Sequence, residues 1–266
     1  MLAKRMFRIQ YVSDLHLECY SKVVFPLFVK PAARYLALAG DIGQPGHRVF
    51  ESFLQYVSWH WDHVFFIPGT KEYSTHRDVH DTHAALSQSI DKYKNIHYLH
   101  YNNPSFTTKE NVTILGATMW PRDVWYPKIQ VKRIDFEERY TLGPAMLHPI
   151  QRETMTMLET QIRYNNALKQ PICMLTHHVP SKQLISSRFS QVADAERLMV
   201  SHVKAWIYGK THSANNRILN GVLTAVNARG YPYECVPGYS STAYLEFPLD
   251  DTESHIYPEV ARSAYF

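Results

Sequence analysis

Short apolar runs alternate with longer amphipathic segments along the first half of the chain. Residues 7–13 alternate apolar and polar side chains, which is typical of a strand with one buried face. Residues 35–39 and 64–67 are continuous apolar runs that end in glycine or proline, as buried strands do. Residues 47–61 place apolar side chains at helical spacing. The order predicts strands that alternate with helices.

The second half is richer in strands. Met155, Leu158 and Ile162 mark a helix that ends near Gln170, whereas residues 120–148 contain four prolines and no steady period. We expect this irregular segment to form a loop or small cap over a site. The other predicted elements are a polar helix at 75–93 and strands at 96–99, 112–115, 171–176, 205–208, 221–226 and 242–247. Together the elements predict one α/β domain over residues 1–266, layered around central sheets.

Composition agrees with a single large globular domain and excludes several other classes. The chain has 266 residues, 45% of them hydrophobic and 20% charged, so disorder and collagen-like structure are excluded. The three cysteines form no paired framework, which favours a reduced compartment. No apolar run approaches the roughly 20 residues that cross a bilayer, and the first residues make a poor signal peptide. We expect a cytoplasmic protein with no membrane contact.

Polar clusters follow five of the predicted strands, and loops at the carboxyl ends of strands are where open α/β sheets place their sites. Asp14 and His16 lie two residues apart, so in extended geometry they point to the same side. An oxygen and a nitrogen donor that converge in this way suit manganese, iron or zinc. The clusters are Ser13–His16, Gly40–Gly43, Gly69–Glu72, His177–His178 and Gly209–His212.

Each cluster also has an ordinary structural interpretation. A single Asp-x-His is usually a turn or the start of a helix, and a buried histidine is more often a core residue than a ligand. Five such clusters at five strand ends, in this order, favour a site. The net charge of +4 permits an anionic ligand such as phosphate but is too small to indicate nucleic-acid binding.

The clusters resemble the motifs of the calcineurin-like metallophosphoesterase superfamily, which are D-x-H, G-D, G-N-H-D/E, a histidine after a strand, and G-H-x-H. The blocks LALAGDIG, LGATMW, MLTHHVPS, WIYGKTHS and VNARGY are similar to those of small bacterial-type phosphohydrolases, and the resemblance runs from Asp14 to about Tyr231. It implies a four-layer α-β-β-α sandwich and metal-dependent hydrolysis of a phosphomonoester or phosphodiester.

The resemblance also implies a ligand set. Asp14, His16 and His212 would hold the first metal, and Asp41 would bridge to a second. His177 would bind the second metal or a phosphate oxygen, in preference to its neighbour His178.

Three positions depart from the family pattern, and all three belong to the second metal site or adjoin it. Thr70 replaces an asparagine ligand, Lys71 replaces the histidine that polarises phosphate or protonates the leaving group, and Lys210 replaces a histidine ligand. One divalent cation with two ammonium groups carries the same formal charge as two divalent cations. We therefore expect one transition metal, with Lys210 in the second position and hydrogen-bonded to Asp41, and with Lys71 and Lys210 clamping phosphate.

The same substitutions permit a different function. Losing two ligands and the usual acid could leave a catalytically inactive binding scaffold with the same fold. Manganese-dependent turnover of a phosphoester would favour the enzyme, whereas neither metal binding nor turnover would favour the scaffold.

Two further features remain open from the sequence. Three histidines at helical spacing suit one face of a zinc site, although a solvated helix face explains them more simply. A basic segment beside aromatic residues can bind a nucleotide or nucleic acid, or can be a solvated loop with aromatic anchors. The histidines are His76, His80 and His83, and the segment comprises Trp120, Trp125, Tyr126, Lys128, Lys132, Arg133 and Arg139. Asn227 in the VNARGY block has a structural role as its first interpretation.

Overall fold

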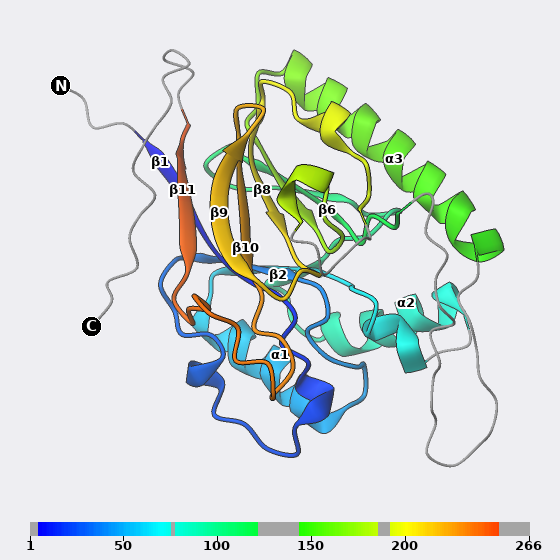
Figure 1. The fold of residues 1–266 in the computed structure, drawn as a ribbon, viewed down its shortest axis with the longest axis vertical. Helices are drawn as coiled ribbons and strands as arrows, with labels where there is room; N and C mark the ends of the chain where they lie inside the picture. Colours follow the sequence, from blue (N-terminus) through cyan, green and yellow to red (C-terminus); the bar gives the residue numbers. More distant parts are fainter. Residues whose placement is uncertain (1–4, 76–77, 122–143, 186–191, 250–266) are drawn as a thin grey trace.

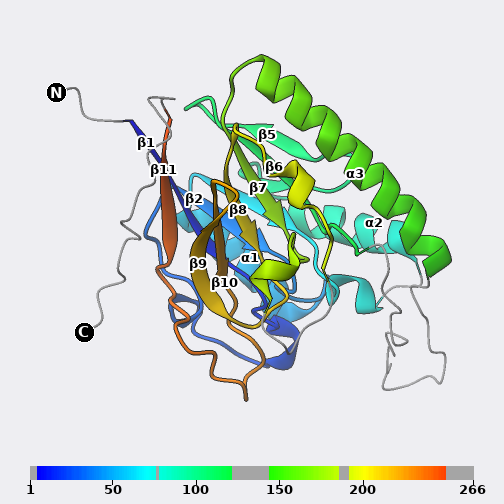
Figure 2. The same cartoon turned by 45° about the horizontal axis from the view of Figure 1, so that its top comes forward.

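Two β-sheets lie face to face in the computed structural model, which describes residues 5–75, 78–121, 144–185 and 192–249 (Figures 1 and 2). The order of the first sheet is β11 (Tyr244–Pro248), β1 (Met6–Val12), β2 (Tyr35–Ala39), β3 (His63–Ile67), β4 (Ile96–Tyr98). Its strands are parallel except for β11, which is antiparallel to β1. The order of the second is β5 (Ser105–Thr107), β6 (Thr113–Ala117), β7 (Ile172–Thr176), β8 (Val203–Tyr208), β10 (Val222–Asn227), β9 (Ala214–Leu219).

The two-residue period of each strand sorts its side chains between two cores. In β3, Phe65 and Ile67 pack between the sheets, whereas Val64 and Phe66 pack against the outer helices. In β7, Cys173 and Leu175 face the first sheet, and Ile172 and Met174 face outward. These strands are buried on both sides, which explains why their sequences are continuous apolar runs.

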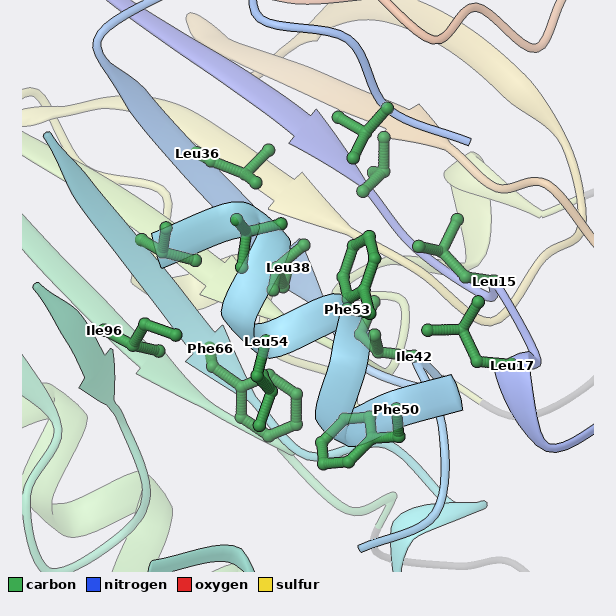
Figure 3. Close-up of a cluster of buried hydrophobic side chains, with 14 of the residues drawn as sticks. Leu15, Leu17, Leu36, Leu38, Ile42, Phe50, Phe53, Leu54, Phe66 and Ile96 are labelled. Carbon is green, nitrogen blue, oxygen red and sulfur yellow. The ribbon is translucent and has the colours of Figure 1, made fainter. Parts of the chain in front are cut away.

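Helices cover the outer face of each sheet. Helices α1 (Arg48–His60) and α2 (Val79–Ile90) pack on the first sheet, and α3 (Pro144–Ala167) packs on the second. Figure 3 shows how Phe50, Phe53 and Leu54 of α1 reach Leu38 and Phe66 of the sheet. The predicted four-layer α-β-β-α sandwich is confirmed. None of the helices in the described ranges combines the length and apolar character needed to span a bilayer.

Each predicted strand and helix is present within a few residues of its expected bounds, but two strands were not predicted. Strand β9 is an outer strand of its sheet, and half of the residues in its sequence, ANNRIL, are polar; none of the six is fully buried. Strand β5 is only three residues long. Helix α3 begins at Pro144, so the end of the expected irregular segment is helical, and residues 122–143 lie outside the described residues.

Candidate metal centre

The predicted ligands lie together where neighbouring strands end. Asp14 and His16 follow β1, Asp41 follows β2, His177 follows β7, and His212 follows β8. They form two groups that share one carboxylate: Asp14 with His16 and His212, and Asp14 with Asp41 and His177. Within each group the donor atoms lie within 4.8 Å of one another. The structure therefore brings together all five residues that were predicted as metal ligands from the sequence.

Backbone hydrogen bonds between the loops fix this arrangement. The amide of Asp14 donates to the carbonyl of Gly40 at 3.0 Å, and the amide of His16 donates to the carbonyl of Asp41 at 3.0 Å. Five residues of the centre have left-handed backbone angles, which turn the chain back sharply after each strand. Their φ values are 52° for Asp14, 48° for His16, 51° for Asp41, 72° for Lys210 and 44° for His212.

In the first group, imidazole nitrogens converge on a buried carboxylate. Nε2 of His212 lies 3.2 Å from Nε2 of His16 and 3.5 Å from Oδ1 of Asp14. Asp14 is fully buried, and its Oδ1 has no hydrogen-bond partner, whereas its Oδ2 accepts from the amide of Lys210 at 3.0 Å. A buried carboxylate oxygen without a donor is costly unless a ligand satisfies it.

Charges around the first group change its pKa values. Burial alone would raise the pKa of Asp14, but its contact with His212 and the charge of His177 lower it. Burial likewise opposes the charged form of His212, but Asp14 and Glu234 raise its pKa to about 9. The first group is therefore built around a carboxylate that stays ionised despite its burial.

Each of the three histidines uses its Nδ1 to contact an oxygen outside the centre. His16 contacts Glu18 at 3.1 Å, His177 contacts the carbonyl of Ala39 at 3.0 Å, and His212 contacts Glu234. Such contacts orient the ring and direct Nε2 toward a ligand. Nε2 of His177 is buried without a hydrogen-bond partner, 3.5 Å from Oδ1 of Asp41.

The second group is partly occupied by donors of the protein itself. The carboxylate of Asp41 accepts from the amide of Lys71 at 2.7 Å and from the hydroxyl of Thr70 at 3.1 and 3.2 Å. The ammonium of Lys210 donates to Oγ1 of Thr70 at 2.9 Å. The direct hydrogen bond expected between Lys210 and Asp41 is thus replaced by a relay through Thr70, because the threonine hydroxyl stands between the two groups.

The relay places a positive charge close to Asp41. Burial would raise the pKa of Asp41, but the charges of His177 and Lys210 lower it far below its usual value. Burial and the charges of His177 and Lys210 also lower the pKa of the neighbouring His178, which favours its neutral form.

The side chain of Lys71 lies beside Tyr231. Its Nζ is 5.5 Å from the centroid of the Tyr231 ring, and that ring stacks on His16 with centroids 3.9 Å apart. Burial lowers the pKa of Lys71, but Tyr231 raises it above its usual value overall. Lys71 therefore remains an ammonium at the edge of the first group.

Glu72 ties the loops after β2 and β3 together. This buried carboxylate accepts backbone N–H groups from Ile42 and Gly69 at 2.8 Å, from Asp41 at 3.1 Å and from Gly43 at 3.3 Å. Burial and the charge of Asp41 raise the pKa of Glu72 to about 8, and the backbone donors act in the opposite direction. The loops approach so closely that a Cβ on Gly69 would lie 2.3 Å from the amide and Oδ1 of Asp41.

The residues present fit a divalent transition metal. Carboxylate oxygens and imidazole nitrogens are the mixed donor set that manganese, iron and zinc accept. The partnerless Oδ1 of Asp14 and Nε2 of His177 are the buried atoms that a cation would satisfy. Asp14, His16 and His212 form the group whose donors would hold one ion, and Asp41 belongs to the neighbouring group.

Other residues that the sequence singled out lie elsewhere or have structural roles. His178 contacts the carbonyl of Thr118 at 3.2 Å and belongs to neither ligand group. The ring of His83 contacts the hydroxyls of Tyr73 and Tyr98, so a zinc site on its helix is not supported. His80 is exposed and Trp120 is buried. The side-chain amide of Asn227 donates to the carbonyls of Tyr11 and Ser240, which agrees with a structural role. The structure does not describe the remaining residues of these two features, which are His76, Trp125, Tyr126, Lys128, Lys132, Arg133 and Arg139.

Three carboxylates that contact the centre, those of Glu18, Glu72 and Glu234, were not predicted from the sequence. Glu18 follows His16 by two residues, and Glu72 ends the third polar cluster, so proximity in sequence was an available signal. Glu234 lies 22 positions after His212, and no period or motif in the sequence connects them.

Comparisons with known proteins agree with this architecture. No family model matches the chain. The chain is 25% identical over 264 residues to the uncharacterized protein L509 of Acanthamoeba polyphaga mimivirus, covering 85% of this chain and 92% of the relative. It superposes on the phosphopantetheinyl hydrolase PptH of Mycobacterium tuberculosis with a TM-score of 0.63 at 16% identity, over 84% of this chain and 89% of that one. The fold is of the metallophosphoesterase type.

A more distant structural neighbour is a putative 5′-nucleotidase from Staphylococcus aureus. The superposition has a TM-score of 0.51 at 11% identity, and it covers 96% of this chain but 56% of the other. At these identities the likeness concerns the fold alone, so the chemistry must be argued from the centre itself.

Proposed function

We propose that the protein hydrolyses a phosphomonoester or phosphodiester with one divalent transition metal held by Asp14, His16, Asp41 and His212. The observation that carries the proposal is the buried Oδ1 of Asp14, which makes no hydrogen bond of normal length although the Nε2 atoms of His16 and His212 lie close to it. The hydrolase names of both structural neighbours support the reaction class.

Lys210 supports the proposal of one metal rather than two. Its ammonium sits beside Thr70, whose hydroxyl contacts Asp41, so a positive charge already lies in the half of the centre that lacks two of the family's ligands. Lysine suits this position because it carries a compact charge with three donors. A second divalent cation there would meet both electrostatic repulsion and a carboxylate already engaged by protein donors.

Each remaining group has a role toward a phosphoester. A bound divalent cation supplies Lewis-acid activation of water and neutralises phosphate charge. The ammonium groups of Lys71 and Lys210 attract and hold the anionic phosphate, and Nε2 of His177 binds a phosphate oxygen or a weakly held second ion. If the basic segment at 128–139 covers the centre, a nucleotide or nucleic-acid phosphodiester is the preferred substrate class.

The proposal is tested by a metal count together with turnover. The purified protein is expected to carry one manganese, iron or zinc ion per chain by elemental analysis, and to hydrolyse bis-p-nitrophenyl phosphate when manganese is added. Asp14→Asn is expected to lose both properties, whereas Asp62→Asn, which changes an exposed aspartate paired with Arg34, should keep them.

Two results would contradict the proposal in different ways. Two ions at full occupancy would show that Lys210 does not replace a metal. Neither metal nor turnover in the parent protein would instead favour the alternative of a binding scaffold with this fold.

A further inference from the structure

A carboxylate from a distant turn contacts the metal-ligand candidate His212 from behind. Oε2 of Glu234 accepts from Nδ1 of His212 and also from the backbone amide of Tyr231 at 2.8 Å. We propose that Glu234 is a positioning residue that orients His212 for cation binding and couples the turn at 228–234 to the metal centre. This inference rests on the proposed function, because it concerns the same cation.

The chemistry of the contact fixes which nitrogen of His212 faces the centre. A carboxylate only accepts hydrogen bonds, so Nδ1 of His212 carries the hydrogen in this contact. Nε2 then lies toward Oδ1 of Asp14, 3.5 Å away, and toward Nε2 of His16. A carboxylate behind a histidine ligand also increases the electron density on the nitrogen that binds the metal.

The turn is shaped to admit this carboxylate. Gly230 has φ +76°, and a Cβ at that position would lie 2.5 Å from Oε2 of Glu234. Any other residue would both strain the backbone and push Glu234 away from His212. The amide of Gly230 donates to the carbonyl of Asp14 at 2.9 Å, so the same turn is anchored to the other side of the centre.

A comparison with His16 shows what is particular to Glu234. His16 contacts Glu18, which lies only two residues further along the same loop. Glu234 instead comes from a separate segment, whose Tyr231 stacks on the His16 ring. One side chain thus connects the orientation of His212 with the placement of the aromatic ring over His16.

The direct test is the affinity for manganese, measured by calorimetry or by competition with a fluorescent chelator. Loss of the hydrogen-bond partner behind a metal ligand typically weakens metal binding about 10- to 100-fold. We expect Glu234→Ala to show a loss in this range. Glu234→Gln, which keeps an acceptor oxygen but not the charge, should show a smaller loss.

A second pair of variants changes no charge. Gly230→Ala keeps Glu234 but displaces its carboxylate, and it is expected to weaken manganese binding in the same direction as Glu234→Ala. Gly221→Ala is the matched control, since Gly221 has φ +77° and an added Cβ there would meet no atom within 4 Å. It should carry the same backbone strain but bind manganese like the parent protein.

Melting temperatures separate positioning from a general loss of stability. Each variant is melted in excess EDTA and again in saturating manganese. A positioning role predicts that the rise caused by manganese shrinks in Glu234→Ala and Gly230→Ala but not in Gly221→Ala. Equal manganese affinities in Glu234→Ala and the parent would overturn this inference and leave the proposed function intact. Absence of manganese binding in the parent would overturn both.

Discussion

The two halves of the centre lie at the ends of neighbouring strands and share Asp14, yet they present their acceptors differently. In the first half, Oδ1 of Asp14 is buried without a donor, and imidazole nitrogens of His16 and His212 face it. In the second half, the carboxylate of Asp41 already accepts from Thr70 and Lys71. An acceptor that the protein satisfies itself offers less to a cation.

The difference also concerns the source of positive charge. In the first half, Oδ1 of Asp14 faces the His212 imidazole 3.5 Å away, and a bound metal would supply the charge that the buried aspartate requires. In the second half the ammonium of Lys210 is present through Thr70. Under the proposed function, substitutions confined to the second half would leave the first half to hold a single ion.

The largest effect is expected from restoring metal-ligand side chains in the second half. Thr70→Asn with Lys210→His removes the ammonium and adds an amide oxygen and an imidazole nitrogen beside Asp41 and His177. We expect manganese bound per chain to rise from one ion to two, measured by elemental analysis after gel filtration. If the double variant still binds one ion, Lys210 is not what excludes the second.

The next largest effect is expected from removing a ligand of the first half. His212→Ala should weaken manganese binding by more than about 100-fold, because even an outer hydrogen-bond partner accounts for 10- to 100-fold. Calorimetry measures the change. His60→Ala, which alters an exposed histidine at the end of α1, is the control and should bind like the parent. Similar affinities in both variants would remove His212 from the ligand set.

Removing the Lys210 ammonium alone should have an intermediate effect, which concerns kcat/KM for the phosphoester. A hydrogen bond from a charged group contributes about 1.5–3 kcal/mol, which corresponds to roughly 10- to 100-fold. We expect Lys210→Met to lower kcat/KM for bis-p-nitrophenyl phosphate by this factor. Lys109→Met, in an exposed turn, is the control. An unchanged kcat/KM would show that Lys210 has no role toward phosphate.

The smallest effect is expected from the relay itself. Thr70→Val keeps the shape of the side chain but removes the hydroxyl between Lys210 and Asp41. A neutral hydrogen bond contributes about 1 kcal/mol, so kcat/KM should fall about five-fold. A loss as large as that of Lys210→Met would mean that Thr70 determines where the ammonium lies.

Much of the fold was predictable because its strands are buried on both sides. Strands β2, β3 and β7 contain apolar runs of four or five residues, and the polar residues after these runs mark the edge where the centre lies. Strand β9 gave no such signal, since an edge strand with exposed side chains has little need of apolar residues.

The centre was predictable in its ligands but not in its contacts. Asp14, His16 and Asp41 follow strands in short motifs, so their types and spacing carry the information. The positions of the Lys210 ammonium and of Glu234 depend on how side chains from distant segments pack. No local pattern in the sequence encodes such distances.

The left-handed backbone at the centre has a consequence for the evolution of the protein. Asp14, His16, Asp41, Lys210 and His212 all have positive φ, where a side chain costs about 1 kcal/mol or more relative to glycine. A selection for heat resistance alone would therefore be expected to accumulate glycine at these positions and erase the chemistry. Selection for the function of the centre, rather than for the stability of the fold, is what would keep side chains there.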